Sequence, residues 1–425
     1  MRQLLHQSGF YIVVTYCLVR LYELLWAQKT FPFMLHLVMA AGACYVGLRL
    51  MLVSKQGIRV TSAEMSVAGM LFLFAFSLAG QYAFVGSMTD MDGVDTFTFT
   101  INILINDVFW LLAGAAMSTC RLEYSLPRAI TIIAVVGAIV LNASGEDSLF
   151  IDYYHIVSTS ELESLTHLNV AEFAVCLIFI CYASVKRLRV VVFLVSIVIL
   201  FLLGGRSSLY FTIATIGAYE LLSGSRRSIL VFGVLGIALA GLFFIALQVG
   251  LLDYEDKFVQ EMLLTEGLEE DASYRERSYI ALQSFGMLSQ QWMFGDPKLI
   301  ASSFGQIGNY LHNLLSVWQF FGILPFLAMV AILIACLLRM RKALSSRPSP
   351  LVTFGSLILI YTVISVIASK FFGFRFLWVS IGFWMLKPDL SPGRYADVRM
   401  PFGRKSVRGR RRRSREKKLT GSIRF

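Results

Sequence analysis

Long apolar runs restrict the fold of this chain more than any other feature of its sequence. Of the 425 residues, 57% are hydrophobic and only 15% are charged, and the apolar residues gather in stretches that can cross the hydrocarbon core of a bilayer. Because lipid cannot hydrogen-bond to an exposed backbone, such stretches fold as helices. We therefore predict an all-α, polytopic integral membrane protein with about 12 transmembrane helices. The predicted spans lie near residues 9–27, 32–53, 63–85, 99–119, 128–143, 169–185, 189–204, 208–222, 228–250, 313–338, 351–369 and 372–386.

Charged residues between the runs predict the orientation of the chain. Lys and Arg concentrate in alternate loops, which marks those loops as cytoplasmic, and acidic residues occupy the opposite loops. Both termini are then cytoplasmic. Residues 1–386 are expected to form the transmembrane helical domain, with a large external loop at about 251–311 between spans nine and ten.

Residues 387–425 form a basic tail that accounts for the whole net charge of +11. The tail carries 14 Lys or Arg residues against three acidic residues. Because few of its residues are apolar, we expect it to lack a fixed structure and to rest on anionic lipid headgroups in the cytoplasm. Such a charge run is also compatible with nucleic-acid binding. Cytoplasmic anchoring explains it more simply, so no nucleic acid is expected as a partner.

A polar stripe opens the tenth predicted span. Asn309, His312, Ser316 and Gln319 recur at intervals of three or four residues, which on a helix places them on one face. Unpartnered polar groups are unfavourable in hydrocarbon, so this face is expected either to line a wet cavity or to pack against another helix. An imidazole at a cavity mouth suits a general base, because histidine titrates near neutral pH.

Five cationic side chains lie in segments predicted to be external, against the general pattern. They are Arg206 in a glycine turn, Arg275 and Arg277 in the large loop, and Lys370 and Arg375 in the turn before the last span. Such a set suits an anionic ligand such as a lipid diphosphate, because the arginine fork donates two parallel hydrogen bonds to phosphate oxygens. Each cation is equally compatible with snorkelling or a salt bridge. Within span four, Asp107 is either a functional carboxylate or a structural partner across the bundle.

The order of these features resembles the O-antigen polymerase and ligase superfamily, in particular Wzy-type polymerases. The resemblance covers about residues 204–325. Its matching residues are Gly204-Gly205-Arg206-Ser207-Ser208, Arg275, Tyr279, Ala281-Leu282, Phe294-Gly295-Asp296-Pro297, Gly305, Gly308, His312-Asn313 and Gly322. Two departures stand out. Either Arg275 or Arg277 corresponds to the family arginine, and the usual Gly-x-Gly after the loop is loosened to Gly295 and Gly305.

The resemblance implies a GT-C-like fold and a metal-independent glycosyltransferase of the bacterial inner membrane. It would act at the periplasmic face, polymerising undecaprenyl-diphosphate-linked oligosaccharide repeat units into O-antigen or a related surface polysaccharide. His312 would be the catalytic base, without a metal or another cofactor. The expected substrate-binding residues are Arg206, Arg275, Arg277, Lys370, Arg375, Asn309, Asn313 and Ser316. Membrane lipids and a chain-length regulator of the polysaccharide copolymerase type are the expected partners.

Three alternatives stay open. A ligase of the same superfamily, which passes finished polymer to a lipid A core or a protein, would share the fold and the site. A flippase or transporter predicts paired halves and ionisable residues at mid-bilayer, whereas here the cations cluster at one face and no internal repeat is visible. A non-catalytic scaffold would have no need of His312 or of the arginines.

Overall fold

The computed structural model describes part of the chain. The described residues are 10–22, 39–46, 61–84, 96–143, 167–223, 233, 241, 272–298 and 311–386, apart from positions 12, 41, 44, 291, 346 and 347. The chain divides into two units, Met1–Lys387 and Pro388–Phe425. All described residues belong to the first unit, so the predicted basic tail lies outside them.

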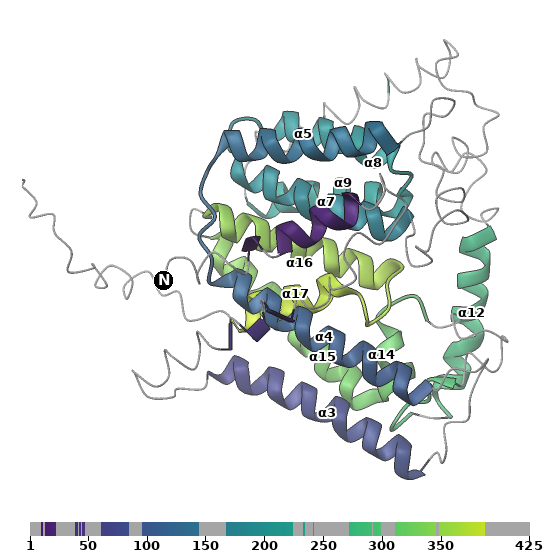
Figure 1. The fold of residues 1–425 in the computed structure, drawn as a ribbon. Coiled ribbons are helices and arrows are strands. Elements are labelled where there is room, and N and C mark those ends of the chain that lie inside the picture. Colours follow the sequence, from purple (N-terminus) through teal and green to yellow (C-terminus); the bar gives the residue numbers. More distant parts are fainter. Residues whose placement is uncertain are drawn as a thin grey trace, which may run out of the picture. The chain divides into compact units, whose positions relative to one another are not determined.

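Every regular element among the described residues is a helix, as predicted. Five helices are long and apolar enough to cross a membrane, namely α3, α4, α5, α15 and α16. The chain is therefore a multi-pass α-helical membrane protein, while the count of 12 spans and the GT-C-like fold stay predictions. The helices (Figure 1) are α3 (Ser62–Phe84), α4 (Thr96–Ser118), α5 (Leu126–Ala143), α7 (His167–Ser184), α8 (Arg189–Leu202), α9 (Arg206–Leu222), α12 (Ala272–Leu288), α14 (Leu315–Phe321), α15 (Ile323–Leu344), α16 (Pro350–Ala368) and α17 (Arg375–Met385).

The prediction that the tenth span is a single helix is wrong. Instead of one helix over 313–338, α14 ends at Phe321 and α15 begins at Ile323. Gly322 separates them with φ 85° and ψ −179°, a conformation that glycine adopts without strain. A Cβ atom at Gly322 would lie 2.0 Å from the carbonyl oxygen of Met293, so the segment that follows α12 occupies the break.

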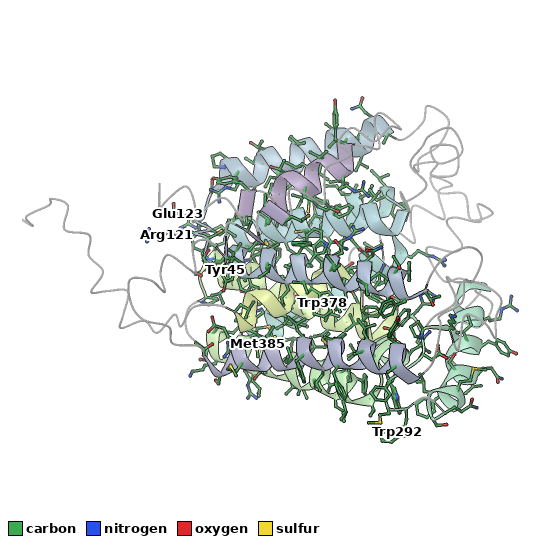
Figure 2. The ribbon with its side chains drawn as sticks, turned by 60° about the horizontal axis from the view of Figure 1, so that its bottom comes forward. Tyr45, Arg121, Glu123, Trp292, Trp378 and Met385 are labelled. Atoms are coloured by element: carbon green, nitrogen blue, oxygen red, sulfur yellow. The ribbon has the colours of Figure 1, made fainter. Side chains whose placement is uncertain are left out.

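The early helix α4 and the late helix α17 pack closely against each other. A Cβ atom at Gly114 would lie 2.1 Å from the carbonyl oxygen of Val379, and one at Gly382 would lie 1.9 Å from that of Leu111. Glycine at both positions therefore lets the two backbones touch, as small residues do between membrane helices. Trp378 of α17 is fully buried beside this contact (Figure 2).

Contacts between distant segments sort the helix ends into two groups. At the first end, which we call the His312 end, Leu314 donates its N–H to the carbonyl of Val366 at the end of α16, 2.7 Å away. At the other, the Arg189 end, Ser125 donates its N–H to the carbonyl of Ser184, 3.0 Å away. The contacts place the end of α7 and the start of α5 at the Arg189 end, and the end of α16 and the start of α14 at the His312 end. Which end faces the cytoplasm stays a prediction.

Candidate functional site

Charged side chains gather around the first turns of α7 at the His312 end. The ammonium group of Lys370 forms a salt bridge with the carboxylate of Glu172. The guanidinium carbons of Arg375 and Arg20 lie 5.4 and 5.9 Å from the centroid of the Phe173 ring, within cation–π range. We call these five residues the α7 cluster. Its cations come from two distant parts of the chain, Arg20 from the helix Val13–Tyr22 and Lys370 with Arg375 from the turn before α17 and its first residue.

Asp107 of α4 lies beside the α7 cluster. Its carboxylate is fully buried and lies within electrostatic range of Arg375. Within the described part of the chain, both carboxylate oxygens of Asp107 lack a hydrogen-bond partner. The buried Nη1 of Arg375 lacks one as well. Buried polar groups are rarely left this way. Of the two interpretations of Asp107, its position next to Arg375 fits a partner across the bundle.

Arg206 reaches the same end of the bundle at the start of α9. The preceding Gly205 is so close to α7 that an added Cβ atom would lie 2.5 Å from the Cβ of Ala171. Ala171 directly precedes Glu172, so this contact places the backbone of Arg206 next to the α7 cluster. Its side chain is half-buried. Three of the five predicted external cations, Arg206, Lys370 and Arg375, are thus brought together.

His312 and Asn313 lie in a turn that precedes α14. The prediction that the polar stripe lies on one face of a helix is therefore wrong, because the helix begins only at Leu315. The Asn313 side-chain oxygen accepts the N–H of Leu315 at 2.9 Å, and the Gln319 side-chain oxygen accepts the N–H of Leu311 at 2.9 Å. These bonds satisfy backbone donors at the helix start, as capping side chains do. His312 itself is half-buried.

Ser316 ties the His312 turn to the turn that carries Lys370. Its hydroxyl is fully buried and accepts the N–H of Phe372 at 2.9 Å. The carbonyl of Phe372 in turn accepts the indole N–H of Trp378 at 2.8 Å. Ser316 therefore holds two parts of the site together. Asn309, the remaining residue of the predicted stripe, lies outside the described residues.

Two polar residues of α3 hold the break after α14, and the sequence analysis missed them. The Ser77 hydroxyl lies within hydrogen-bond distance of the carbonyls of Phe294 and Phe321, at 2.7 Å from the first. The Gln81 amide donates to the carbonyls of Phe294 and Phe320, at 2.6 and 2.5 Å. Carbonyls that a helix leaves open at its C-terminus are thereby satisfied. The available signal was a Ser and a Gln four residues apart inside an apolar run.

The last two predicted cations lie on α12. Arg275 is exposed, and the side chain of Arg277 lies outside the described residues. Ile280 and Leu288 of α12 are buried against Leu311, the residue before His312. Helix α12 therefore borders the His312 turn, but the exposed Arg275 side chain lies on its surface.

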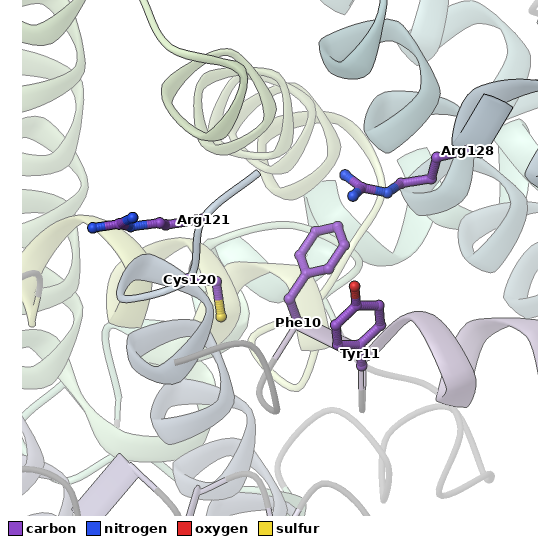
Figure 3. A pocket seen from close by; sticks show the side chains of 5 residues that line it. All are labelled: Phe10, Tyr11, Cys120, Arg121 and Arg128. Carbon is purple, nitrogen blue, oxygen red and sulfur yellow. The ribbon is translucent and has the colours of Figure 1, made fainter. Parts of the chain in front are cut away.

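A separate pocket lies at the Arg189 end (Figure 3). It is lined by Phe10, Tyr11, Cys120, Arg121 and Arg128. The guanidinium of Arg128 points toward Phe10, whereas that of Arg121 points away, so the two do not converge on one ligand. Burial raises the pKa of the Cys120 thiol to about 12, which keeps it protonated at neutral pH. Across the described residues, no three His, Cys, Asp or Glu side chains lie close enough together to hold a metal ion.

Comparisons with known proteins add no relative to this picture. No protein family, no curated protein and no solved structure matches the chain. The resemblance to the O-antigen polymerase and ligase superfamily therefore stays a prediction from its motif residues. Any functional conclusion depends on those residues and on the geometry of the His312 end.

Proposed function

We propose that this protein is a glycosyltransferase that polymerises undecaprenyl-diphosphate-linked repeat units into O-antigen or a related surface polysaccharide. The observation that carries the proposal is the convergence of Arg206, Lys370 and Arg375 with the His312 turn at one end of a membrane helix bundle. In this proposal the His312 end faces the periplasm of a bacterial inner membrane, and both termini are cytoplasmic.

The cations would bind the diphosphate of the lipid-linked donor. The buried Nη1 of Arg375 has no hydrogen-bond partner among the described residues, so a phosphate oxygen would satisfy it. Arg206 lies close enough in the fold to contribute a second guanidinium. Cations already in place stabilise the negative charge that develops on a departing diphosphate. Lys370 is engaged by Glu172, which would orient it at the rim of the site.

His312 would act as the general base. It takes the proton from a sugar hydroxyl of the acceptor while that oxygen bonds to the anomeric carbon of the donor. The bond from the anomeric carbon to the diphosphate breaks, and undecaprenyl diphosphate leaves with the electron pair. The side-chain oxygens of Asn313 and Ser316 are engaged with backbone N–H groups. The proposal therefore gives these two residues the task of positioning His312.

A polymerase needs room for two lipid diphosphates, whereas a ligase needs room for one and for a bulky acceptor. The α7 cluster offers one group of cations, and the exposed Arg275 on α12 offers a second place near the same turn. This separation favours polymerisation. A chain-length regulator would be an additional partner that sets the length of the product.

Purified protein in lipid vesicles tests the proposal. Given only the undecaprenyl-diphosphate-linked repeat unit of its host, it should produce a ladder of longer lipid-linked products. The His312→Ala variant should lose about 100-fold or more in rate, while Asn142→Ala, an exposed residue of α5, should match the wild type. Product formed only after a separate acceptor is added would show a ligase. Folded protein without product in either case would exclude a glycosyltransferase.

A further inference from the structure

Helix α12 carries large apolar side chains on two opposite faces. On the inner face, Ile280 and Leu288 are 3% and 2% exposed and pack against Leu311. On the outer face, Leu282 and Phe285 are 76% and 61% exposed. A helix whose outer face is exposed to water carries mainly polar residues there. The large apolar side chains on the outer face of α12 therefore indicate an apolar neighbour.

The outer face also carries a cation and an aromatic hydroxyl. Arg275, Tyr279, Leu282 and Gly286 follow one another at intervals of four, three and four residues, which places them along one line on the helix. The Tyr279 side chain is 59% exposed, and Arg275 is exposed as well. Arginine, tyrosine and large apolar side chains on one face are typical of helices that lie at the boundary between lipid headgroups and acyl chains.

The C-terminal end of α12 is attached where two membrane-spanning helices begin or end. The ring of Phe294, just beyond α12, lies 5.9 Å from the ring of Phe76 on α3. The carbonyl of Trp292 accepts the N–H of Ile323, the first residue of α15, at 2.9 Å. Trp292 is 56% exposed and lies at the margin of the molecule (Figure 2). Helix α12 runs across the ends of neighbouring helices rather than alongside them (Figure 1).

We infer that the outer face of α12 lies in the bilayer, at the headgroup–acyl boundary of the leaflet nearest the His312 end. Leu282 and Phe285 enter the acyl region, and Arg275 stays at the level of the lipid phosphates. Lipid is the occupant favoured over a protein partner for two reasons. Just beyond α12, Phe294 packs against Phe76, a 48% exposed residue of the membrane-spanning helix α3, and Arg275 near the start of α12 suits phosphate.

This placement has a consequence for the His312 turn and does not depend on the proposed function. Because the inner face of α12 covers Leu311, a helix fixed at the boundary holds the next residue, His312, near the depth of lipid phosphates. For the proposed function, this placement would let a lipid-linked diphosphate reach the site by lateral movement within the leaflet. The membrane position of α12 can be measured without any assay of activity.

Spin labels on α12 test the inference in vesicles that contain only this protein and lipid. Leu282→Cys and Phe285→Cys place labels on the outer face, Phe72→Cys on α3 is the lipid control, and Glu123→Cys in a turn is the water control. Cys17, Cys120, Cys176, Cys181 and Cys336 are all buried, and the signal of labelled wild type is subtracted. All replaced side chains are exposed, so folding should persist, which size-exclusion chromatography checks.

The expected result is that labels at 282 and 285 collide more often with oxygen than with a water-soluble nickel chelate, as at position 72. The ratio should be reversed at position 123. Labels on α12 should also report a shallower depth than the label at 72. Labels at 282 and 285 that behave like the one at 123 would overturn the inference. Labels immobilised and shielded from both reagents would do so too, because they would show a protein contact with a second copy.

Discussion

The two ends of α7 carry arginine–aromatic clusters that look alike and differ in charge balance. At the Arg189 end, the guanidinium carbon of Arg189 lies 5.1 and 5.6 Å from the ring centroids of Tyr182 and Tyr219. Its Nη1 lies 3.1 Å from the Glu220 carboxylate, which also accepts the Tyr182 hydroxyl at 2.7 Å. One cation here faces one carboxylate. Of the buried atoms described in this cluster, only Nε of Arg189 has no hydrogen-bond partner.

Among the described side chains, the α7 cluster at the His312 end holds more cations than carboxylates. Its described members include three cations, Arg20, Lys370 and Arg375, against Glu172 and the neighbouring Asp107. Atoms of Asp107 and Arg375 are buried without hydrogen-bond partners among the described residues. A balanced cluster is what a structural ion pair requires. Buried polar atoms without partners beside several cations are instead what an anionic ligand can complete.

The largest difference should follow from removing the carboxylate at each end. Glu220→Ala leaves Arg189, whose side chain is 17% exposed, without its counter-ion and also removes the acceptor of the Tyr182 hydroxyl. It should therefore lower the free energy of unfolding by about 3–5 kcal/mol. Glu172→Ala should lower it by about 1–3 kcal/mol, because the described contact that it removes is the single one with Lys370. Denaturant titration in mixed micelles measures both. Equal losses would contradict the comparison.

The same conservative substitution at the two ends should separate stability from activity. Arg375→Lys keeps the charge but removes the fork, so polymerisation should fall by a factor that corresponds to about 1–3 kcal/mol, with little change in unfolding. Arg189→Lys should instead lower the unfolding free energy by about 1 kcal/mol, because the planar stacking on two rings is lost. Its activity per folded molecule should be unchanged. Initial rates normalised to folded protein distinguish the two variants. Loss of activity per folded molecule in Arg189→Lys would contradict a purely structural role for the Arg189 end.

A small effect on stability is also expected from Asp107→Asn. The amide has the same shape, and the oxygens it replaces have no hydrogen bond to lose within the described structure, so unfolding should change by less than about 1 kcal/mol. Activity should still fall, because Arg375 loses the charge that orients it. Glu220→Gln is the matched control, in which stability should fall and activity per folded molecule should not. Undiminished activity in Asp107→Asn would show that Arg375 is held by other contacts.

Helix positions were predictable from the sequence because a segment that crosses the lipid must be apolar along most of its length. The ends of α3, α9 and α16 lie within two residues of the predicted spans. The break at Gly322 was not predictable, because both flanking segments are apolar. It depends on a segment near Met293 that packs against it and on Ser77 and Gln81 from another helix.

The candidate site was predictable in its residue types but not in its pairings. Positive charges in the wrong loops indicated Arg206, Lys370 and Arg375, and the structure brings them to one end of the bundle. The sequence could not show that Lys370 is engaged by Glu172 or that Arg375 lies over Phe173, because these partners are about 200 residues away along the chain. His312 was expected inside a helix, since periodicity does not reveal side chains such as Asn313 that bond to the backbone where a helix begins.

The backbone contact between α4 and α17 bears on how the protein is made. Leu111 and Gly114 leave the ribosome long before Val379 and Gly382, the residues that they touch. Until α17 is inserted, α4 has no neighbour to cover this surface or the buried carboxylate of Asp107. We expect chains that stop before Arg375 to insert their earlier spans and yet to stay open and be degraded. Insertion of α17, the last described helix, thus serves as the closing step in assembling the described bundle.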